Sequence, residues 1–240
     1  MNRSSVSTVA LDAACAMFAI VGCAHPTIVC PEGAKPVWGP SLQAELIPDA
    51  RVLACVGPDG IQQGYSFGYV GDRLMTVGHY VDGKLDGSTV IWHASGRRWL
   101  VGDFDAGEPT GTTTEWNEAG IKVWEEILGA PGEPSISTGW YDDGTLKYTI
   151  VSVGDEFHGE YERYYANGQL KTRGQYVHSR RHGTWTCWDE SGKSRVDTVY
   201  DQGEVVSSSG DTDDAQAMEA CERGCAASEG TSVCRSCAED

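Results

Sequence analysis

The distribution of β-forming and turn-forming residues along the chain predicts a long series of short strands. From about residue 59 to residue 205, runs rich in Val, Thr, Trp and Tyr alternate with polar stretches that contain Gly, Asp or Asn. Residues 184–189, for example, are β-forming, residues 190–192 are typical of a turn, and residues 193–200 form a return strand. The pattern therefore predicts hairpins in this part of the chain.

The hairpin pattern repeats every 24 residues. An aromatic column and a glycine column keep this spacing in phase, and they comprise Trp92, Trp116, Trp140, Tyr164 and Trp188, and Gly96, Gly120, Gly144, Gly168 and Gly192. Three further columns, which begin at Tyr80, Gly83 and Gly87, have the same period. Residues 59–64 match residues 82–87, which extends the array back to about residue 59 and gives six units. Tandem units of this length are typical of proteins whose repeats stack on one another.

Two kinds of turn are expected in each unit. Asp143-Gly144 and Asn167-Gly168 are pairs preferred in two-residue hairpin turns, where both central residues have positive φ. The other turn, as in residues 82–87, is longer and more polar. Because one hairpin is marginally stable in water, we expect the units to form one antiparallel sheet of about ten to twelve strands. The predicted fold is all-β, an elongated and twisted antiparallel β-meander.

The aromatic column is expected to pack one face of this sheet. Trp99, Tyr161 and Trp185 would then lie partly exposed on the second face, where a large apolar strip would be an interaction site. Composition supports the fold, since 30 Gly, 8 Trp and 10 Tyr accompany only 4 Phe. The formal net charge of −17 argues against a general nucleic-acid-binding protein, because phosphates would be repelled.

Residues 1–22 are expected to be a signal peptide. Arg3 is followed by an apolar stretch over residues 13–22, which is too short to span a bilayer but long enough for the core of a signal. The stretch ends in Ile20-Val21-Gly22-Cys23, which resembles a lipobox and predicts lipidation of Cys23. The protein would then be exported and membrane-anchored, as a bacterial lipoprotein of the periplasm, outer membrane or cell surface. Cleavage near Ala24 and an uncleaved N-terminus are the alternatives.

Residues 23–58 are expected to form a linker and N-terminal cap, and residues 206–240 a separate acidic, Cys-rich segment. This segment begins with a Ser/Gly-rich linker, and from residue 211 it holds eight acidic residues against two arginines. Its cysteines are spaced i, i+4 and i, i+3, which predicts short helices, and they are Cys221, Cys225, Cys234 and Cys237.

Two interpretations of the four C-terminal cysteines remain open. In an oxidising compartment they would form disulfides, most naturally Cys221–Cys237 with Cys225–Cys234. In a reducing compartment the four thiolates would bind zinc. Elsewhere, Cys30 and Cys55 flank the start of the array and could pair, whereas Cys187 is expected to be a buried free thiol.

A basic patch interrupts the acidic background and is a candidate binding site. It comprises Lys171, Arg173, Arg180, Arg181 and His182. Arg180, Arg181 and His182 are expected in one long loop between strands, where they would meet an anionic lipid, a phosphate or an acidic protein surface. The alternative is a solvated loop that pairs with the acidic tail of the same chain.

Residues 165–193 carry a resemblance to a known family. The runs Tyr165-Ala166-Asn167-Gly168-Gln169-Leu170-Lys171, Gly174-Gln175-Tyr176, Gly183-Thr184-Trp185 and Trp188-Asp189-Glu190-Ser191-Gly192-Lys193 resemble the bacterial MORN-repeat variant, some members of which are antitoxin-like. The resemblance covers residues 59–205 and is strongest over residues 155–203. It implies the β-meander fold and, for function, an interaction platform without a shared chemistry.

No set of residues that would form an enzyme or cofactor site is predicted from the sequence. A Gly-rich phosphate loop, H-E-x-x-H and a His cluster are missing, and no catalytic residue, cofactor or metal is predicted. The leading hypothesis is a non-enzymatic, envelope-anchored scaffold that binds another, unknown protein. The alternatives are a cytoplasmic antitoxin-like or immunity-like protein that neutralises a partner toxin, and a membrane- or glycan-binding module.

Overall fold

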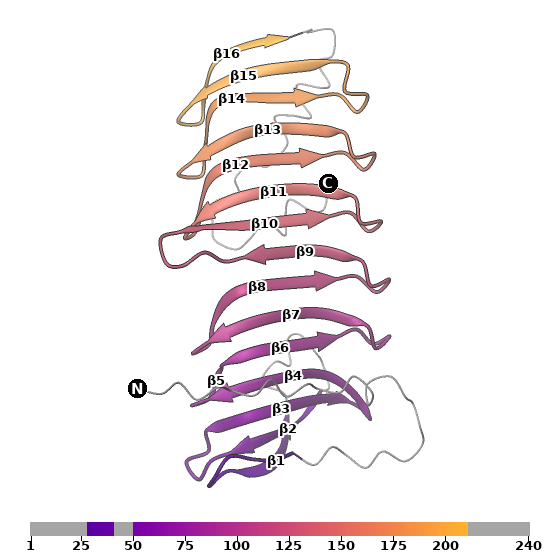
Figure 1. Cartoon of the computed structure of the whole chain (residues 1–240), viewed down its shortest axis with the longest axis vertical. Coiled ribbons are helices and arrows are strands. Elements are labelled where there is room, and N and C mark those ends of the chain that lie inside the picture. The colour runs from indigo at the N-terminus through magenta and orange to yellow at the C-terminus, as the bar shows by residue number, and fades with distance from the viewer. Residues whose placement is uncertain (1–27, 41–49, 211–240) are drawn as a thin grey trace, which may run out of the picture.

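A computed structural model describes residues 28–40 and 50–210, and these residues form one antiparallel β-sheet (Figure 1). Its 16 strands follow one another in chain order across the sheet, apart from the two-residue β5, which pairs with β4. The described residues contain no helix, and so none that could cross a membrane. The predicted all-β antiparallel meander is confirmed, with more strands than expected.

The strands begin and end as follows: β1 (Lys35–Pro40), β2 (Arg51–Val56), β3 (Gln62–Val70), β4 (Arg73–Val81), β5 (Lys84–Leu85), β6 (Gly87–Trp92), β7 (Arg98–Asp105), β8 (Glu108–Trp116), β9 (Lys122–Ile127), β10 (Pro134–Trp140), β11 (Leu146–Val153), β12 (Glu156–Tyr164), β13 (Leu170–Val177), β14 (Arg180–Trp188), β15 (Arg195–Asp201) and β16 (Glu204–Gly210). The sheet thus includes strands from residues 23–58, and β16 occupies residues 206–210, which the sequence suggested as a linker. The signal segment, Cys23 and the expected C-terminal helices lie outside the described residues.

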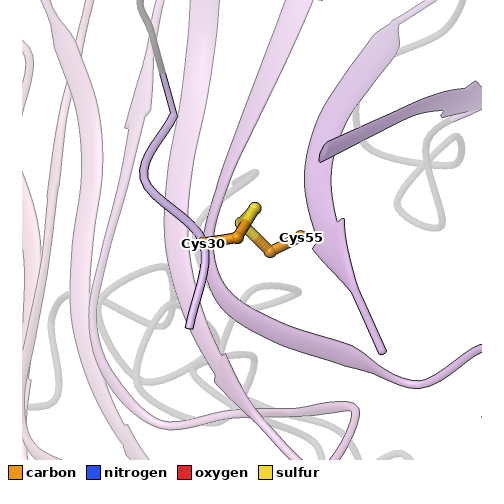
Figure 2. Close-up of a disulfide and its surroundings, with 2 residues drawn as sticks. All are labelled: Cys30 and Cys55. Atoms are coloured by element: carbon orange, nitrogen blue, oxygen red, sulfur yellow. A yellow bond between two sulfur atoms is a disulfide. The ribbon is translucent and has the colours of Figure 1, made fainter. Parts of the chain in front are cut away.

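A disulfide joins the segment before β1 to β2. Cys30 and Cys55 are bonded with an S–S distance of 2.05 Å and a Cα–Cα distance of 5.4 Å (Figure 2). The pairing that the sequence allowed is therefore confirmed. The two cysteines are 25 positions apart in the sequence. The disulfide therefore lowers the conformational entropy of the unfolded chain, which stabilises the fold by about 3 kcal/mol on the chain-entropy model.

The turns differ from the expected assignment. In the loop from Tyr165 to Gln169, only Gly168 has positive φ, at 81°, and its N–H donates to the Tyr165 carbonyl at 2.9 Å. The Tyr165 N–H in turn donates to the Gln169 carbonyl at 2.8 Å. This is a three-residue loop, a type I turn followed by a left-handed glycine. The prediction of a two-residue turn at Asn167-Gly168 is wrong.

Two-residue turns with two positive φ values occur instead at the opposite ends of the strands. Asp82-Gly83, Ala106-Gly107, His178-Ser179 and Gln202-Gly203 have this conformation. The two residues that flank each of these turns pair directly with each other, as Asp201 does with Glu204. At the strand ends that carry the three-residue loops, the paired strands are one residue out of register. The loop therefore needs the additional left-handed glycine.

The three-residue loops also form hydrogen bonds with the strand ends of neighbouring hairpins. The Tyr141 hydroxyl donates to the Tyr164 carbonyl at 2.8 Å, and the Tyr165 hydroxyl donates to the Trp188 carbonyl at 2.9 Å. His93 Nε2 lies 2.7 Å from the Trp116 carbonyl in the same relation. Each loop therefore contacts the end of a strand about one hairpin further along, which adds to the strand pairing between neighbouring hairpins.

Side chains of the C-terminal half form a core on one face of the sheet. The cluster comprises Tyr148, Ile150, Tyr161, Tyr176, Trp185 and Tyr200, all under a tenth exposed; we call this side the core face. Trp185 is 1% exposed and Tyr161 is 6% exposed, so the expectation that both lie partly exposed is wrong. The predicted aromatic column is only half-buried. Four of its five members, Trp92, Trp116, Trp140 and Tyr164, lie at register shifts of the sheet.

Candidate binding surfaces

The core face is organised around the indole of Trp185. Its ring stacks on Tyr161 with centroids 5.6 Å apart, and it meets Tyr176 edge-on at 4.9 Å and Tyr200 edge-on at 6.3 Å. The Trp185 Nε1–H donates to the Gln175 carbonyl at 3.0 Å. Offset and edge-on aromatic pairs of this kind each contribute about 0.5–1.5 kcal/mol beyond their buried area.

Glycines make room for these rings on the neighbouring strands. A Cβ on Gly174 would lie 2.6 Å from Cγ of Trp185, and one on Gly139 would lie 2.6 Å from Cζ of Tyr148. The indole thus lies flat over the β13 backbone, and the phenol over the β10 backbone. The sequence gives Gly174 only as part of the family resemblance. Its role in making room for a ring could not be predicted, because that ring, Trp185, lies on the next strand.

Arg181 belongs to the core face, not to an exposed patch. Its guanidinium carbon lies 4.6 Å from the Trp185 ring centroid and 5.3 Å from that of Tyr200. An N–H of Arg181 donates to the Tyr200 hydroxyl at 3.0 Å. Burial acts to lower the pKa of Arg181, but interactions with Tyr176 and Tyr200 outweigh it and raise the pKa. The charge is therefore retained in a cation–π site.

The other four residues of the predicted patch lie apart from Arg181. Lys171 lies over the Tyr165 ring at 5.3 Å, and burial lowers its pKa. Arg173 pairs with Glu162 at 2.6 Å on the face opposite the core. Arg180 is exposed, and His182 lies 3.6 Å from Asp201. Arg180, Arg181 and His182 are all within β14, so the expected long loop is wrong, and strand alternation sends Arg181 to the other face from its two neighbours.

A polar cluster lies on the face opposite the core. The Tyr164 hydroxyl donates to Glu162 at 2.6 Å, and the Arg173 Nε–H donates to the same carboxylate at 2.7 Å. Burial and the bonded, negatively charged Glu162 raise the pKa of Tyr164 to about 12. The hydrogen bond from Tyr164, followed by those from Arg173, lowers the pKa of Glu162. The cluster joins two neighbouring strands and offers no nucleophile or metal site.

A groove of about 390 Å³ lies at the N-terminal end of the sheet, over β1 to β6. Its lining is more apolar than polar, and it includes the buried polar residues Ser66, Thr76 and Thr89. The lining includes Val37, Val52, Ala54, Val56, Ile61, Gln62, Ser66, Thr76, Tyr80, Asp82 and Thr89. Sequence reasoning missed this groove, because its lining comes from five strands of the most irregular part of the repeat. Small side chains and glycines on neighbouring strands leave the hollow.

The described residues contain no group of three or more metal-ligating side chains. The four C-terminal cysteines lie outside the described residues, so neither their disulfides nor the zinc alternative is tested. Cys187 is disulfide-bonded, which corrects the expectation of a free thiol. Its side chain is buried on the core face, with Sγ 3.7 Å from the Thr172 hydroxyl.

A comparison with known families finds matches in two consecutive hairpins near the C-terminal end of the sheet. The family model described as the MORN repeat variant matches residues 157–178 and residues 181–202. The chain is therefore similar to the MORN repeat variant over residues 157–202. The first match corresponds to β12 and β13 and the second to β14 and β15, so each match covers one hairpin and ends on the first residue of the two-residue turn that follows it. No curated protein matches the chain.

Proposed function

We propose that this protein is a non-enzymatic scaffold that binds another protein through the N-terminal groove of its repeat sheet. The observation that carries the proposal is the groove itself, an apolar hollow at one end of an open sheet. MORN repeats support a binding scaffold more generally. Ligand-binding hollows of this size are typically apolar with a few polar groups that orient the ligand.

The lining of the groove suits an apolar side chain of a partner. Val37 is 46% exposed and Ile61 is 39% exposed, which is costly in water unless a partner covers them. Burying a Val or Ile side chain contributes roughly 1.5–3 kcal/mol. Gln62 and Asp82 in the lining would supply hydrogen bonds and would favour a partner that carries a basic residue next to its apolar one.

Lipid anchoring at Cys23 is the second part of the proposal. The lipobox-like sequence supports it, and so does the Cys30–Cys55 disulfide, because disulfides persist in oxidising compartments. Cys23 precedes Cys30 by only seven residues, so an anchor there would hold the groove end of the sheet near the membrane.

The groove is tested by cross-linking and affinity capture with the full chain. We expect Ile61→Asp to reduce recovery of the captured protein at least about tenfold, since a buried charge costs more than 1.4 kcal/mol. Val177→Asp is the matched control, because Val177 is 36% exposed and lies on β13, far from the groove. Equal capture by the Ile61→Asp variant and the wild-type protein would contradict a role for the groove.

The anchor is tested separately by mass spectrometry of the mature N-terminus and by membrane fractionation. We expect a diacylated Cys23 as the first residue, and release of the Cys23→Ser variant from the membrane fraction. A mature protein that retains residues 1–22 would contradict the anchor and leave the groove proposal standing.

A further inference from the structure

The disulfide of Cys187 requires a partner outside the described residues. Three cysteines lie within the described part of the chain, and two of them, Cys30 and Cys55, are bonded to each other. Cys187 is nevertheless disulfide-bonded. Within one chain, its partner is therefore one of Cys15, Cys23, Cys221, Cys225, Cys234 and Cys237.

We propose that the partner of Cys187 is one of the four C-terminal cysteines, and that residues 211–240 cover the core face over β11 to β15. The segment is within reach. Cys187 pairs with Val196, and Val196 pairs with Gly210, so the end of β16 lies two strands from Cys187 on the same side of the sheet. Two strand spacings are about 10 Å. The 11 residues from Gly210 to Cys221 can span up to roughly 36 Å, so every C-terminal cysteine can reach.

The N-terminal cysteines are poorly placed for this bond. Cys30 is fixed to Cys55 on β2, and β2 and β14 lie near opposite ends of the elongated sheet (Figure 1). Eleven strand spacings separate them in the sheet order, about 53 Å. The seven residues from Cys23 to Cys30 span at most roughly 24 Å when extended. The 15 residues from Cys15 to Cys30 reach roughly 50–54 Å only when fully extended, so a bond from Cys15 to Cys187 would require a straight chain along the whole sheet.

The core face is chemically suited to this segment. Its aromatic cluster around Trp185 is under a tenth exposed, although the described residues form one sheet and place no second layer on this face. Two arginines, Arg163 and Arg181, are part of the same face. Residues 211–240 carry eight acidic residues against two arginines, so the charges of the segment and the face are complementary. The disulfide adds a high effective concentration to an otherwise weak contact.

One consequence concerns the other C-terminal cysteines. A bond from Cys187 to any of them leaves three, an odd number. The proposal therefore excludes the double pairing Cys221–Cys237 with Cys225–Cys234, and it also excludes a zinc site made by all four thiolates. It is independent of the groove at the other end of the sheet.

Tryptic mapping of the unreduced full-length protein tests the bond directly. Cleavage places Cys187 in residues 182–193, Cys221 in residues 196–223, Cys225 and Cys234 in residues 224–235, and Cys237 in residues 236–240. We expect residues 182–193 to be linked to one of the last three peptides, in a protein that runs as a monomer without reductant. An alkylated Cys187, a link to an N-terminal cysteine, or a dimer joined through Cys187 would overturn the proposal.

The covering of the core face is tested by proteolysis at Arg223. In the Cys187→Ser variant we expect cleavage there to be at least about tenfold faster than in the unreduced wild-type protein, because the segment is no longer held. Thr186→Ser is the matched control, since it changes the neighbouring position on the opposite face. Equal cleavage rates for the Cys187→Ser variant and the wild type would overturn the covering. If the variant fails to fold by circular dichroism, the peptide map still decides the bond.

Discussion

Replacing Gly174 by Ala would test how the core face is built. The added Cβ would lie 2.6 Å from Cγ of Trp185 and closer still to two other indole atoms. The ring has no easy way to move, because its Nε1–H is bonded to the Gln175 carbonyl at 3.0 Å and Tyr161 stacks on it. No positive φ is involved at Gly174, so the effect would be purely steric.

The size of the effect follows from these contacts. Forcing an extra methyl group into a packed core costs about 1–3 kcal/mol. Displacement of the indole would also break the hydrogen bond to Gln175, which contributes about 1 kcal/mol. We therefore expect Gly174→Ala to lower the free energy of unfolding by about 2–4 kcal/mol, although alanine normally favours a strand more than glycine does.

Urea unfolding followed by circular dichroism measures this change. Gly39→Ala is the matched control, because a Cβ there meets no atom within 4 Å and Gly39 also lies in a strand. A double-mutant cycle with Trp185→Ala isolates the clash, and we expect a coupling energy of about 1–3 kcal/mol. If Gly174→Ala were as stable as the wild type within about 0.5 kcal/mol, the flat packing of the indole on β13 would be refuted.

Two further predictions concern contacts between hairpins. Glu162→Gln should destabilise the protein at neutral pH, and this loss should become smaller as the pH is lowered towards about 3, as followed by urea midpoints at several pH values. The pKa of Glu162 is lowered in the folded state by Tyr164 and Arg173, so its stabilisation is present above the unfolded pKa and disappears as the pH falls through the folded one. Tyr165→Phe removes the hydrogen bond to the Trp188 carbonyl and should cost about 1 kcal/mol by urea unfolding.

Each of these predictions has a control and a contradicting result. The control is Glu204→Gln, at an exposed carboxylate on the first residue of β16. This change should leave the pH dependence of unfolding as it is in the wild-type protein. A Glu162→Gln effect as large at pH 3 as at neutral pH would contradict the role of the ionised carboxylate. Tyr65→Phe, at a partly exposed tyrosine, controls for Tyr165→Phe. Equal losses at Tyr65 and Tyr165 would argue against the hydrogen bond between loops.

Much of the local structure follows from the sequence because short-range chemistry specifies it. Strands rich in β-branched and aromatic residues, punctuated by Gly and Asx turns, predict antiparallel hairpins, and the structure has them. The Asn167-Gly168 turn shows the limit. The pair marks a turn correctly, but the register of β12 and β13 selects a three-residue loop, in which only the glycine has positive φ.

The candidate site was less predictable. A cluster of charges along the sequence suggested one basic patch, yet adjacent strand residues point to opposite faces, so Arg181 enters the aromatic core while Arg180 stays exposed. The groove over β1 to β6 has no repeat signature, since it depends on which small residues of several strands lie side by side.

The sequence by itself determined that the chain folds into antiparallel hairpins, and it placed Cys30 and Cys55 where they could pair. Only the tertiary structure decided which face of the sheet is the core. The regular aromatic column looked like the core, but most of its members lie at register shifts, where strand alternation is broken. Trp185 became the centre of the core because Gly174, on the neighbouring strand, leaves room for its ring. Such pairing between strands follows from register, which local sequence preferences do not specify.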